Sequence, residues 1–556
     1  MAIKFSAGTS DFAELQETPG VYLVDKSLLI RELFAELDKV ILLPRPRRFG
    51  KTLNMSMLYQ FLSNSNSRPW FEKLKINQHP ELMAELGNHP TIFLSFKDAK
   101  QTTKQETLDY LAGVMSETYG KFRFLEDSLS PSQKMVFTRI LEKKAEGAEL
   151  NRSLLSLSQW LSTYSNKRVW ILLDEYDAPI HSGWQYGYYT DIVAFMQGFL
   201  GAAFKDNSYL YRGVMTGILR VSKENIFSGL NNVSVYSMLH PRYGEYFGFT
   251  DPEIDLICEL GDLNQEREEI RDWYDGYQIR NIHLYNPWSI VKYVSDREFK
   301  PYWVNTSNNF IVKKLIAGAD IDVKQSFEQL IQGQSIIVDI DEHSVLPGVE
   351  GDETEALWSF LLFSGYLKVM GVENIGTKAR CLVGIPNLEI KYLYQDQLSK
   401  LFPSTFANNS YLSLLRSLTS GDILNFEYHL QNYLTTSMSY LDAGREEPER
   451  FYHGFVLGLL VSLENTHQVL SNRESGDGRY DIMIIPKDKN KLGIIIEFKA
   501  CRLRNPSEQD LNSEADKALA QIETQNYQAE LKSQGIKNIL KLGIVFYKKQ
   551  MVIKSA

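Results

Sequence analysis

Cysteine is scarce in this chain of 556 residues, which contains only Cys258, Cys381 and Cys501. Three widely separated thiols cannot form a disulfide framework, and they fit a reducing cytoplasm. No apolar run approaches the ~20 residues that a membrane-spanning helix needs. The first ten residues also lack the charged start and apolar run of a secretion signal. We therefore expect a cytoplasmic protein without a membrane partner.

An excess of positive charge is also absent. The formal net charge is -9 at pH 7, with 60 Lys and Arg residues against 69 Asp and Glu residues. A general attraction to nucleic acid is therefore not expected, and any such contact must come from a local basic surface. The chain is 44% hydrophobic and 23% charged, which is a globular composition. Its length predicts roughly two to four domains.

Short apolar segments alternate with helical patterns in the first 250 residues. Helical spacing follows Lys51 and recurs through most of residues 100–165. The apolar runs predict strands over residues 40–43, 91–96, 169–173 and 209–215. Buried strands separated by helices are typical of a parallel sheet that is covered on both faces. The sequence therefore predicts an α/β domain over residues 1–250.

The pattern changes twice beyond residue 250. Helical segments and aromatic-rich turns dominate residues 251–443, where no catalytic motif occurs, so we expect a mainly helical connector domain. The polar stretch 444–450 then marks a boundary. It is followed by a helix, two strands, a helix and a last strand, expected over residues 451–463, 480–485, 492–498, 515–531 and 542–547. This order predicts a compact α/β domain over residues 444–556.

The strand predicted at residues 40–43 leads to Gly50-Lys51-Thr52, the ending of a phosphate-binding P-loop. Such a loop requires backbone N–H groups at a helix N-terminus, a lysine for the outer phosphates and a Ser or Thr for Mg²⁺. Arg45 replaces the first glycine of the usual motif. The alternative is therefore an ordinary helix start that follows a basic loop.

The strand predicted at residues 169–173 ends in Asp174-Glu175, the arrangement of a Walker B motif. In that motif the first carboxylate holds Mg²⁺ and the second polarises the attacking water. For this pair alone, the alternative is a strand end that enters a polar loop. Because both motifs occur in the expected order, we expect residues 1–250 to bind ATP and Mg²⁺.

A second group of charged residues lies in the C-terminal region. Asp481 begins one predicted strand, and Glu497-Phe498-Lys499 ends the next. Residues two apart on a strand share a face, so Glu497 and Lys499 should lie side by side, with Phe498 on the opposite face. Carboxylates that converge on a divalent cation, with a base or cation near the attacking water, can hydrolyse phosphodiesters. A Glu-x-Lys sequence alone is weak evidence, because charged strand ends are common.

Longer motifs make the sequence resemble a known family, the AAA-ATPase-like proteins that carry a C-terminal PD-(D/E)XK nuclease-superfamily domain. The segment 45–52 has the family's R-P-R-R-F-G-K-[ST] form, so the missing glycine is a family trait. The segment 173–177 resembles the family's Walker B motif. Further resemblance lies in residues 22–27, 216–220, 226–232, 451–453, 471–481 and 518–522. The resemblance implies a P-loop NTPase sheet, followed after the connector by a restriction-endonuclease-like fold.

The resemblance also implies roles for the matching residues of the nucleotide site. Lys51 would bind the β- and γ-phosphates, and Thr52 and Asp174 would hold Mg²⁺. Glu175 would activate the attacking water, and Thr216 would sense the γ-phosphate.

Other residues around this centre are also implied to contact the nucleotide. Arg220 would reach phosphate in the same chain or from a neighbouring subunit of a homo-oligomer, although an exposed arginine after a strand is more often solvated. The loop residues expected at the phosphates are Arg48, Phe49 and Gly50. The arginines at positions 45, 47 and 48 either supply positive charge there or pair with local acids.

In the C-terminal region, the resemblance implies a metal-dependent nuclease site. Asp481 and Glu497 would be ligands of Mg²⁺ or Mn²⁺, and Lys499 would orient or activate water. Gln521, on the following helix, would be an accessory site residue. Two weaker candidates are Glu449, as a third carboxylate, and His453, which is more often structural than catalytic.

Two classes of function follow from these expectations. In the first, ATP binding and hydrolysis are coupled to a nuclease domain that cleaves DNA or RNA, with the ATPase either driving the nuclease or gating it as a slow sensor. In the second, the protein is an ATP-dependent switch whose C-terminal domain binds nucleic acid or protein without cleaving.

Overall fold

The structure, a computed structural model of the chain, forms two compact units. The first comprises Met1–Asn308 and Ile337–Ile390, and the second comprises Asn309–Ile336 and Lys391–Ala556. The structure describes residues 4–5, 8–219, 232–279, 282–304, 312, 321–331, 333–342, 346, 353–375, 378–401, 408–437, 452–453, 456–457, 459–460, 463, 466–471, 474–475, 478–501, 503 and 506–556.

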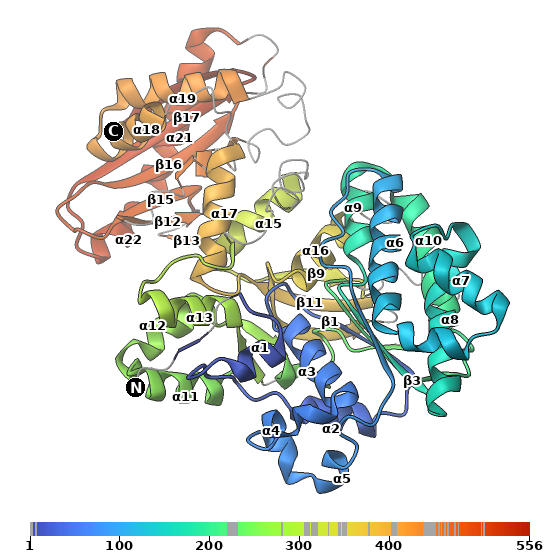
Figure 1. Ribbon diagram of the computed structural model, residues 1–556. Coiled ribbons are helices and arrows are strands. Elements are labelled where there is room, and N and C mark those ends of the chain that lie inside the picture. Colours follow the sequence, from blue (N-terminus) through green and yellow to red (C-terminus); the bar gives the residue numbers. More distant parts are fainter. Residues whose placement is uncertain are drawn as a thin grey trace. The chain divides into compact units, whose positions relative to one another are not determined.

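A five-stranded parallel sheet is the centre of the first unit (Figure 1). Its strands, in spatial order, are β2 (Thr91–Ser95), β3 (Val169–Asp174), β4 (Leu210–Gly217), β1 (Val40–Pro44) and β5 (Val233–Val235). Every residue of β1 and β3 is buried, as expected for continuous apolar strands that are covered on both faces. The predicted α/β fold is confirmed, but the short strand β5 was not predicted.

Helices cover both faces of this sheet (Figure 1). Helices α2 (Leu28–Ala35) and α3 (Lys51–Ser63) cover one face, where Leu58 and Phe61 share an apolar core with Trp170. The other face is covered by α6 (Lys104–Lys121), α7 (Pro131–Leu141), α8 (Gly147–Ser165), α9 (Ala178–Tyr186) and α10 (Tyr189–Phe204). Short helices complete this part: α1 (Phe12–Glu17), α4 (Arg68–Phe71) and α5 (Pro80–Met83).

The region predicted to be mainly helical also contains two small sheets. One contains β6 (Phe249–Thr250), β8 (Ile282–Tyr285) and β7 (Tyr277–Ile279), and the other contains β10 (Lys368–Ile375), β11 (Lys378–Gly384) and β9 (Ile336–Ile340). Its helices within the first unit are α11 (Asp251–Gly261), α12 (Arg267–Tyr274), α13 (Pro287–Asp296) and α16 (Glu353–Phe363). Residues 251–443 are thus shared by the two units. The three domain ranges 1–250, 251–443 and 444–556 stay predictions.

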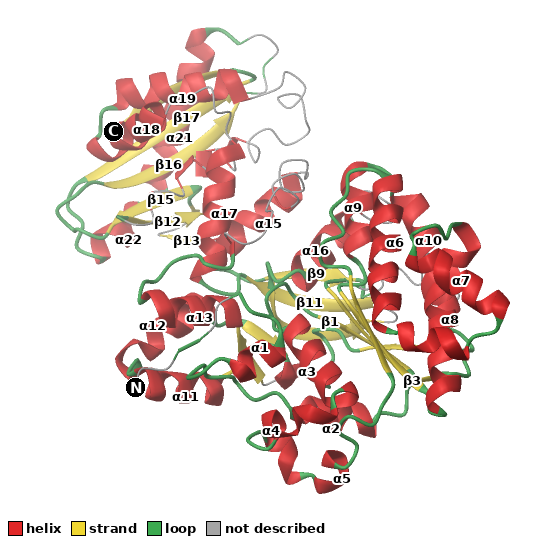
Figure 2. Cartoon of the chain, in the orientation of Figure 1, coloured by secondary structure: helices red, strands yellow, loops and turns green. Residues whose placement is uncertain are grey.

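The second unit is built around a five-stranded mixed sheet flanked by helices (Figure 2). Its strands, in spatial order, are β12 (His467–Ser471), β15 (Ile482–Pro486), β16 (Gly493–Ala500), β17 (Ile539–Tyr547) and β18 (Gln550–Ser555). Strands β16 and β17 are parallel, and the other neighbours are antiparallel. The remaining elements are α15 (Ile321–Ile331), α17 (Leu388–Leu401, which contains the boundary between the units), α18 (Asn408–Ser420), α19 (Ile423–Ser437), α21 (Glu508–Thr524), α22 (Gln528–Ser533) and the hairpin β13 (Glu474–Ser475) and β14 (Gly478–Arg479).

Strand β16 is buried on both faces, which explains its apolar run. Ile494, Ile496 and Phe498 pack in a core with residues of α18 and α19. Ile495, on the opposite face, packs with Ile522 of α21. Phe498 therefore lies on the opposite face from Glu497 and Lys499, as the two-residue period predicts.

Three details of this unit differ from the sequence prediction. The strand predicted to be the last is followed by β18, whose polar residues obscure the strand pattern. Strand β12 was also not predicted. The single helix predicted over residues 515–531 is two helices, α21 and α22, and Asn526 between them has a positive φ of 49°. The helix predicted over residues 451–463 lies partly outside the described residues.

Among the described helices, none has the length and apolar character needed to cross a membrane.

Candidate nucleotide-binding and nuclease sites

Strand β1 leads through a tight loop into α3, which begins at Lys51. Gly50 caps the helix with a φ of 81°, a left-handed conformation that favours glycine. Arg48 has a φ of 66°, so the loop makes two left-handed turns within three residues. The amide of Asn54 then donates to the Gly50 carbonyl at 3.0 Å and closes the first helical turn. The loop therefore ends at a helix N-terminus, where unpaired backbone N–H groups can face an anion.

Lys51 is buried inside this loop. Its Nζ donates hydrogen bonds to the carbonyls of Arg45 at 3.0 Å and Pro46 at 2.9 Å. Burial lowers the pKa of Lys51, and the carboxylates of Glu175 and Asp174 act in the opposite direction. The ammonium group thus lies in a site that also attracts a cation through its carboxylates.

Asp174 is fully buried at the end of β3 and gathers hydroxyl groups from three elements. Its Oδ2 accepts hydrogen bonds from Thr52 Oγ1 at 2.8 Å and Ser95 Oγ at 3.1 Å. Its Oδ1 accepts from Thr216 Oγ1 at 2.7 Å. Hydroxyl and carboxylate oxygens are the donors that Mg²⁺ prefers, so this set fits a Mg²⁺ ion. The structure thus brings together Thr52, Asp174 and Thr216, which the sequence singled out.

Ser95 was not foreseen as a member of this group. It is the last residue of β2 and pairs in register with Asp174 on the neighbouring strand. A hydroxyl residue near the end of a predicted strand is a signal only when the strand order is known. The order β2-β3 in the sheet supplies that information.

Glu175 follows Asp174 and leaves the strand in a left-handed conformation with a φ of 51°. Such a conformation is strained for a residue with a side chain, and it often occurs at functional sites. The Glu175 amide donates to Thr216 Oγ1 at 3.4 Å. Burial raises the pKa of the Glu175 carboxyl group, and the Lys51 ammonium opposes that shift.

Asp177 anchors the end of β4 beside this centre, a role that the sequence did not reveal. Its buried Oδ2 accepts hydrogen bonds from the amides of Ile218 at 2.8 Å and Leu219 at 2.9 Å. His181 Nε2 lies 3.3 Å from the same oxygen. The carboxylate therefore fixes the chain immediately after Thr216.

The arginines of the loop pack against aromatic rings. Arg45 is fully buried, with Nη1 donating to the Tyr236 carbonyl at 2.6 Å and the guanidinium 5.0 Å from the Phe247 ring. Burial lowers the pKa of Arg45 to about 9. The Arg48 guanidinium lies 4.3 Å from the centre of the Trp288 ring. Among the described residues, neither arginine is within ion-pair distance of an acid, so neither pairs with a local carboxylate.

The side chain of Phe49 is buried and meets the Tyr277 ring edge to face at 4.8 Å. Phe49 therefore uses its side chain for packing, so only its backbone is available to a phosphate, whereas the Arg48 side chain is exposed beside Trp288. The segment that contains Arg220 lies outside the described residues, so the expectation for Arg220 stays a prediction.

In the second unit, Asp481 and Glu497 belong to neighbouring strands of one hairpin. Ile482 of β15 is paired with Ile496 of β16 in antiparallel register. Extending the register by one residue sets Asp481 opposite Glu497, and directly opposite residues share a face. Asp481 Oδ2 also accepts a hydrogen bond of 2.7 Å from the Phe498 amide. Burial raises the pKa of the Asp481 carboxyl group.

Glu497 is buried and contacts two of the other predicted site residues. Its Oε1 lies 3.3 Å from Lys499 Nζ, and it also accepts a hydrogen bond from Gln521 Nε2. Gln521 projects from α21, the helix that covers this face of the sheet. The structure therefore brings Glu497, Lys499 and Gln521 into contact.

Tyr527 supports this group and was not foreseen. Its hydroxyl lies 3.3 Å from Gln521 Nε2 and donates to the Arg479 carbonyl at 2.7 Å. Tyr527 lies in the break between α21 and α22, directly before α22, and the sequence pattern did not reveal this break.

His453 contacts the backbone of Asp481. Its Nε2 lies 3.1 Å from the Asp481 carbonyl and 3.0 Å from Ser471 Oγ. A carbonyl oxygen can only accept, so Nε2 must carry the proton. Burial lowers the pKa of His453 and favours the neutral ring. His453 is thus held between the Asp481 backbone and the Ser471 side chain.

Asp481 and Glu497 offer carboxylate oxygens, which are suitable ligands for Mg²⁺ or Mn²⁺. Within the part of the chain that the structure describes, no cluster of three or more His, Cys, Asp or Glu residues is arranged to hold a metal. Glu449, the candidate third carboxylate, lies outside that part. The described residues therefore provide a two-carboxylate donor set beside Lys499.

Comparisons with known proteins find one family match in the N-terminal part of the chain and another in the C-terminal part. Residues 6–227 match the family described as Predicted AAA-ATPase, and residues 447–556 match the PD-(D/E)XK nuclease superfamily. The chain is also 26% identical over 532 residues to the "Uncharacterized protein in vnfD 5'region" of Azotobacter chroococcum mcd 1, with 93% of each chain covered. The resemblance that the sequence motifs carried is thus confirmed.

Proposed function

We propose that this chain, which joins a predicted AAA-ATPase region to a PD-(D/E)XK nuclease-superfamily region, hydrolyses ATP and cleaves nucleic-acid phosphodiesters. The observation that carries the ATPase is the hydrogen bond of 2.8 Å from Thr52 to Asp174. It unites the last residue of the P-loop motif with the first carboxylate of the Walker B motif. In P-loop NTPases these two positions hold one Mg²⁺ ion.

Each candidate residue of the first unit would have a separate role in ATP binding or hydrolysis. The N-terminus of α3 and the Lys51 ammonium would bind the phosphates of ATP. Thr52 and Asp174 would hold Mg²⁺, which neutralises phosphate charge when bound. Glu175 would orient and deprotonate the attacking water. Thr216, which is hydrogen bonded to Asp174, would link the γ-phosphate to the metal site.

In the second unit, Asp481 and Glu497 would hold Mg²⁺ or Mn²⁺ beside the scissile phosphate. Lys499 would orient water and offset the negative charge of the carboxylates. Gln521 would fix the Glu497 carboxylate, since it donates a hydrogen bond to that group. Carboxylates beside a lysine provide both the metal ligands and the cation that phosphodiester hydrolysis needs.

One set of assays tests both activities. Purified protein is incubated with ATP and Mg²⁺ to measure nucleotide binding and hydrolysis. The same protein is mixed with labelled single- and double-stranded DNA and RNA, with Mg²⁺ or Mn²⁺, and with or without ATP. We expect ATP turnover that is lost in Lys51→Ala and cleavage that is lost in Lys499→Ala.

The outcomes separate the candidate functions. Nucleic-acid binding that depends on ATP, without cleavage under any metal condition, would show an ATP-dependent switch instead of a nuclease. An absence of ATP binding by the wild-type protein would refute the proposed ATPase.

A further inference from the structure

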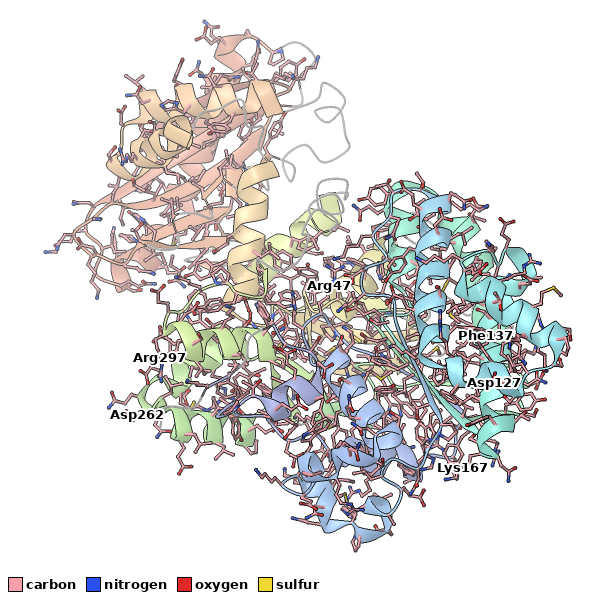
Figure 3. All side chains as sticks on the ribbon, in the orientation of Figure 1. Arg47, Asp127, Phe137, Lys167, Asp262 and Arg297 are labelled. Carbon is pink, nitrogen blue, oxygen red and sulfur yellow. The ribbon has the colours of Figure 1, made fainter. Side chains whose placement is uncertain are left out.

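The outer side of the P-loop is held by residues that lie far away in the sequence but within the same unit. The Trp303 indole Nε1 donates to the Arg47 carbonyl at 3.1 Å, and Arg47 is labelled in Figure 3. The next residue, Arg48, lies over the Trp288 ring at 4.3 Å. Two indole side chains thus contact two consecutive residues of the loop.

Both indole-bearing segments are tied together by one carboxyl group. Glu389 Oε1 accepts a hydrogen bond of 2.5 Å from the Trp303 amide. Its Oε2 accepts one of 2.9 Å from the hydroxyl of Ser289, the residue that follows Trp288. Glu389 is therefore linked to Arg47 through Trp303. It is linked to Arg48 through Ser289 and the neighbouring Trp288, whose ring packs against Arg48.

The environment of Glu389 is unusual for a carboxyl group. Its side chain is only 1% exposed, and no described cation lies within ion-pair distance of it. Burial raises the pKa of Glu389 to about 7. Burying an ionisable group without a cation costs free energy that an apolar residue would not. The benefit of a glutamate at position 389 must therefore come from the segments that its hydrogen bonds hold in place.

We infer that Glu389 is a positioning residue of the nucleotide site, which fixes the Trp288 and Trp303 segments and through them the backbone of Arg47 and Arg48. The inference rests on the proposed ATP binding at the P-loop. Backbone N–H groups bind phosphate only when the loop holds its conformation, so loosening this support should lower affinity for ATP. Glu389 would act on the loop only through these two segments, which it holds by the Ser289 hydroxyl and the Trp303 amide.

The test is the dissociation constant of ATP with Mg²⁺, measured on the full-length protein at a fixed pH. Glu389→Ala should weaken binding about tenfold, the effect of losing a hydrogen bond to a charged group. Glu389→Gln keeps an acceptor for the Trp303 amide and a donor for Ser289, so its affinity should stay within about threefold of wild type. Rescue by glutamine distinguishes positioning from loss of bulk.

Trp303→Phe provides an independent and milder variant. It removes the indole donor to the Arg47 carbonyl but keeps an aromatic ring, and it should also weaken ATP binding. Because Glu389 is proposed to act through Trp303, the double variant should lose less affinity than the sum of the two single effects. Coupling of this kind is not expected from two unrelated structural defects.

Glu253→Ala is the matched control. Glu253 is a largely buried carboxylate of the same unit whose partners include Lys26 at 2.6 Å and the Thr250 amide at 2.8 Å. Its loss should lower stability without changing ATP affinity.

Unchanged ATP affinity in Glu389→Ala, or additive effects in the double variant, would overturn the inference. If Glu389→Ala does not fold, the ATP affinity of Trp303→Phe provides the test. Wild-type ATP affinity in Trp303→Phe would also overturn the inference. Absence of ATP binding by the wild-type protein would instead refute the proposed ATPase, and the inference with it.

Discussion

Thr52 and Asp174 lie 122 residues apart in the sequence, yet the Thr52 hydroxyl donates a hydrogen bond of 2.8 Å to Asp174 Oδ2. The contact joins the N-terminus of α3 to the end of β3. Lys51 and Glu175 flank these two residues in the chain. Single substitutions at those flanking positions should therefore separate nucleotide binding from hydrolysis.

Lys51→Ala should weaken the binding of ATP with Mg²⁺ by at least about tenfold. The variant removes a cation that faces the phosphates, and a charge-assisted hydrogen bond contributes about 1.5–3 kcal/mol. Equilibrium binding of a fluorescent ATP analogue measures the effect. Lys121→Ala, at the exposed end of α6, serves as the control. Equal affinity of Lys51→Ala and wild type would show that this loop is not the phosphate site.

Glu175→Gln should bind ATP within about threefold of wild type but hydrolyse it at least about 100-fold more slowly, because general-base catalysis is lost. The substitution keeps the shape of the side chain and removes the carboxylate that would activate water. Steady-state phosphate release measures turnover, and binding is measured in parallel. Glu117→Gln, an exposed position in α6, is the control. Wild-type turnover in Glu175→Gln would mean that another group activates water.

Cleavage of nucleic acid should require Mg²⁺ or Mn²⁺ and stop when EDTA removes the metal. Glu497→Ala and Lys499→Ala should each lower the cleavage rate by roughly two orders of magnitude, because charge stabilisation at the reacting phosphate is lost. ATP turnover should remain, since these residues belong to the other unit. Glu523→Ala is the control, because Glu523 lies on the same helix as Gln521 and pairs with Lys541. Undiminished cleavage by Asp481→Ala would place the chemistry at another site.

The stability of the protein should carry a pH dependence that Glu389 causes. Burial raises its pKa from 4.5 to about 7, so between these values the folded state binds more protons than the unfolded state. The free energy of unfolding should therefore fall as pH rises through this window, and this contribution is on the order of 3 kcal/mol.

Glu389→Gln has no proton to lose at this position. The melting temperature of the variant, relative to wild type, should therefore rise between about pH 5 and about pH 8. Differential scanning fluorimetry across this range measures the two curves. Parallel curves would show that the carboxyl group titrates normally or not at all.

The sequence predicted those parts of the fold that local patterns encode. Strands β1 and β3 are continuous apolar runs because both of their faces are covered. Their ends carry the P-loop and Walker B motifs, so the position of the nucleotide site followed from the motifs and the parallel sheet. The two-residue period of a strand likewise placed Glu497 beside Lys499.

The supporting residues could not be predicted because they meet through long-range packing. Ser95 reaches Asp174 only because β2 and β3 are neighbours. Tyr527 meets Gln521 only because the chain turns between α21 and α22. Nothing in the sequence pattern singled out Glu389.

The contacts of the loop arginines also could not be predicted from the sequence. Sequence reasoning offered two fates for Arg48, positive charge at the nucleotide or pairing with an acid. Its guanidinium lies over Trp288, 240 residues away in the chain, and spacing gives no sign of that contact.

The packing of the P-loop has a practical consequence for truncated proteins. A fragment that ends at residue 227, where the ATPase family match ends, would lack Tyr277, Trp288 and Trp303. Phe49 would lose its aromatic partner, and exposing such a side chain costs about 1.5–3 kcal/mol. The fragment would also present an apolar patch that invites aggregation. A fragment for biochemical work should therefore run past residue 390, where the first unit ends, to the end of α17 at Leu401. A loss of activity in such a fragment would then not be due to the loss of the residues that support the P-loop.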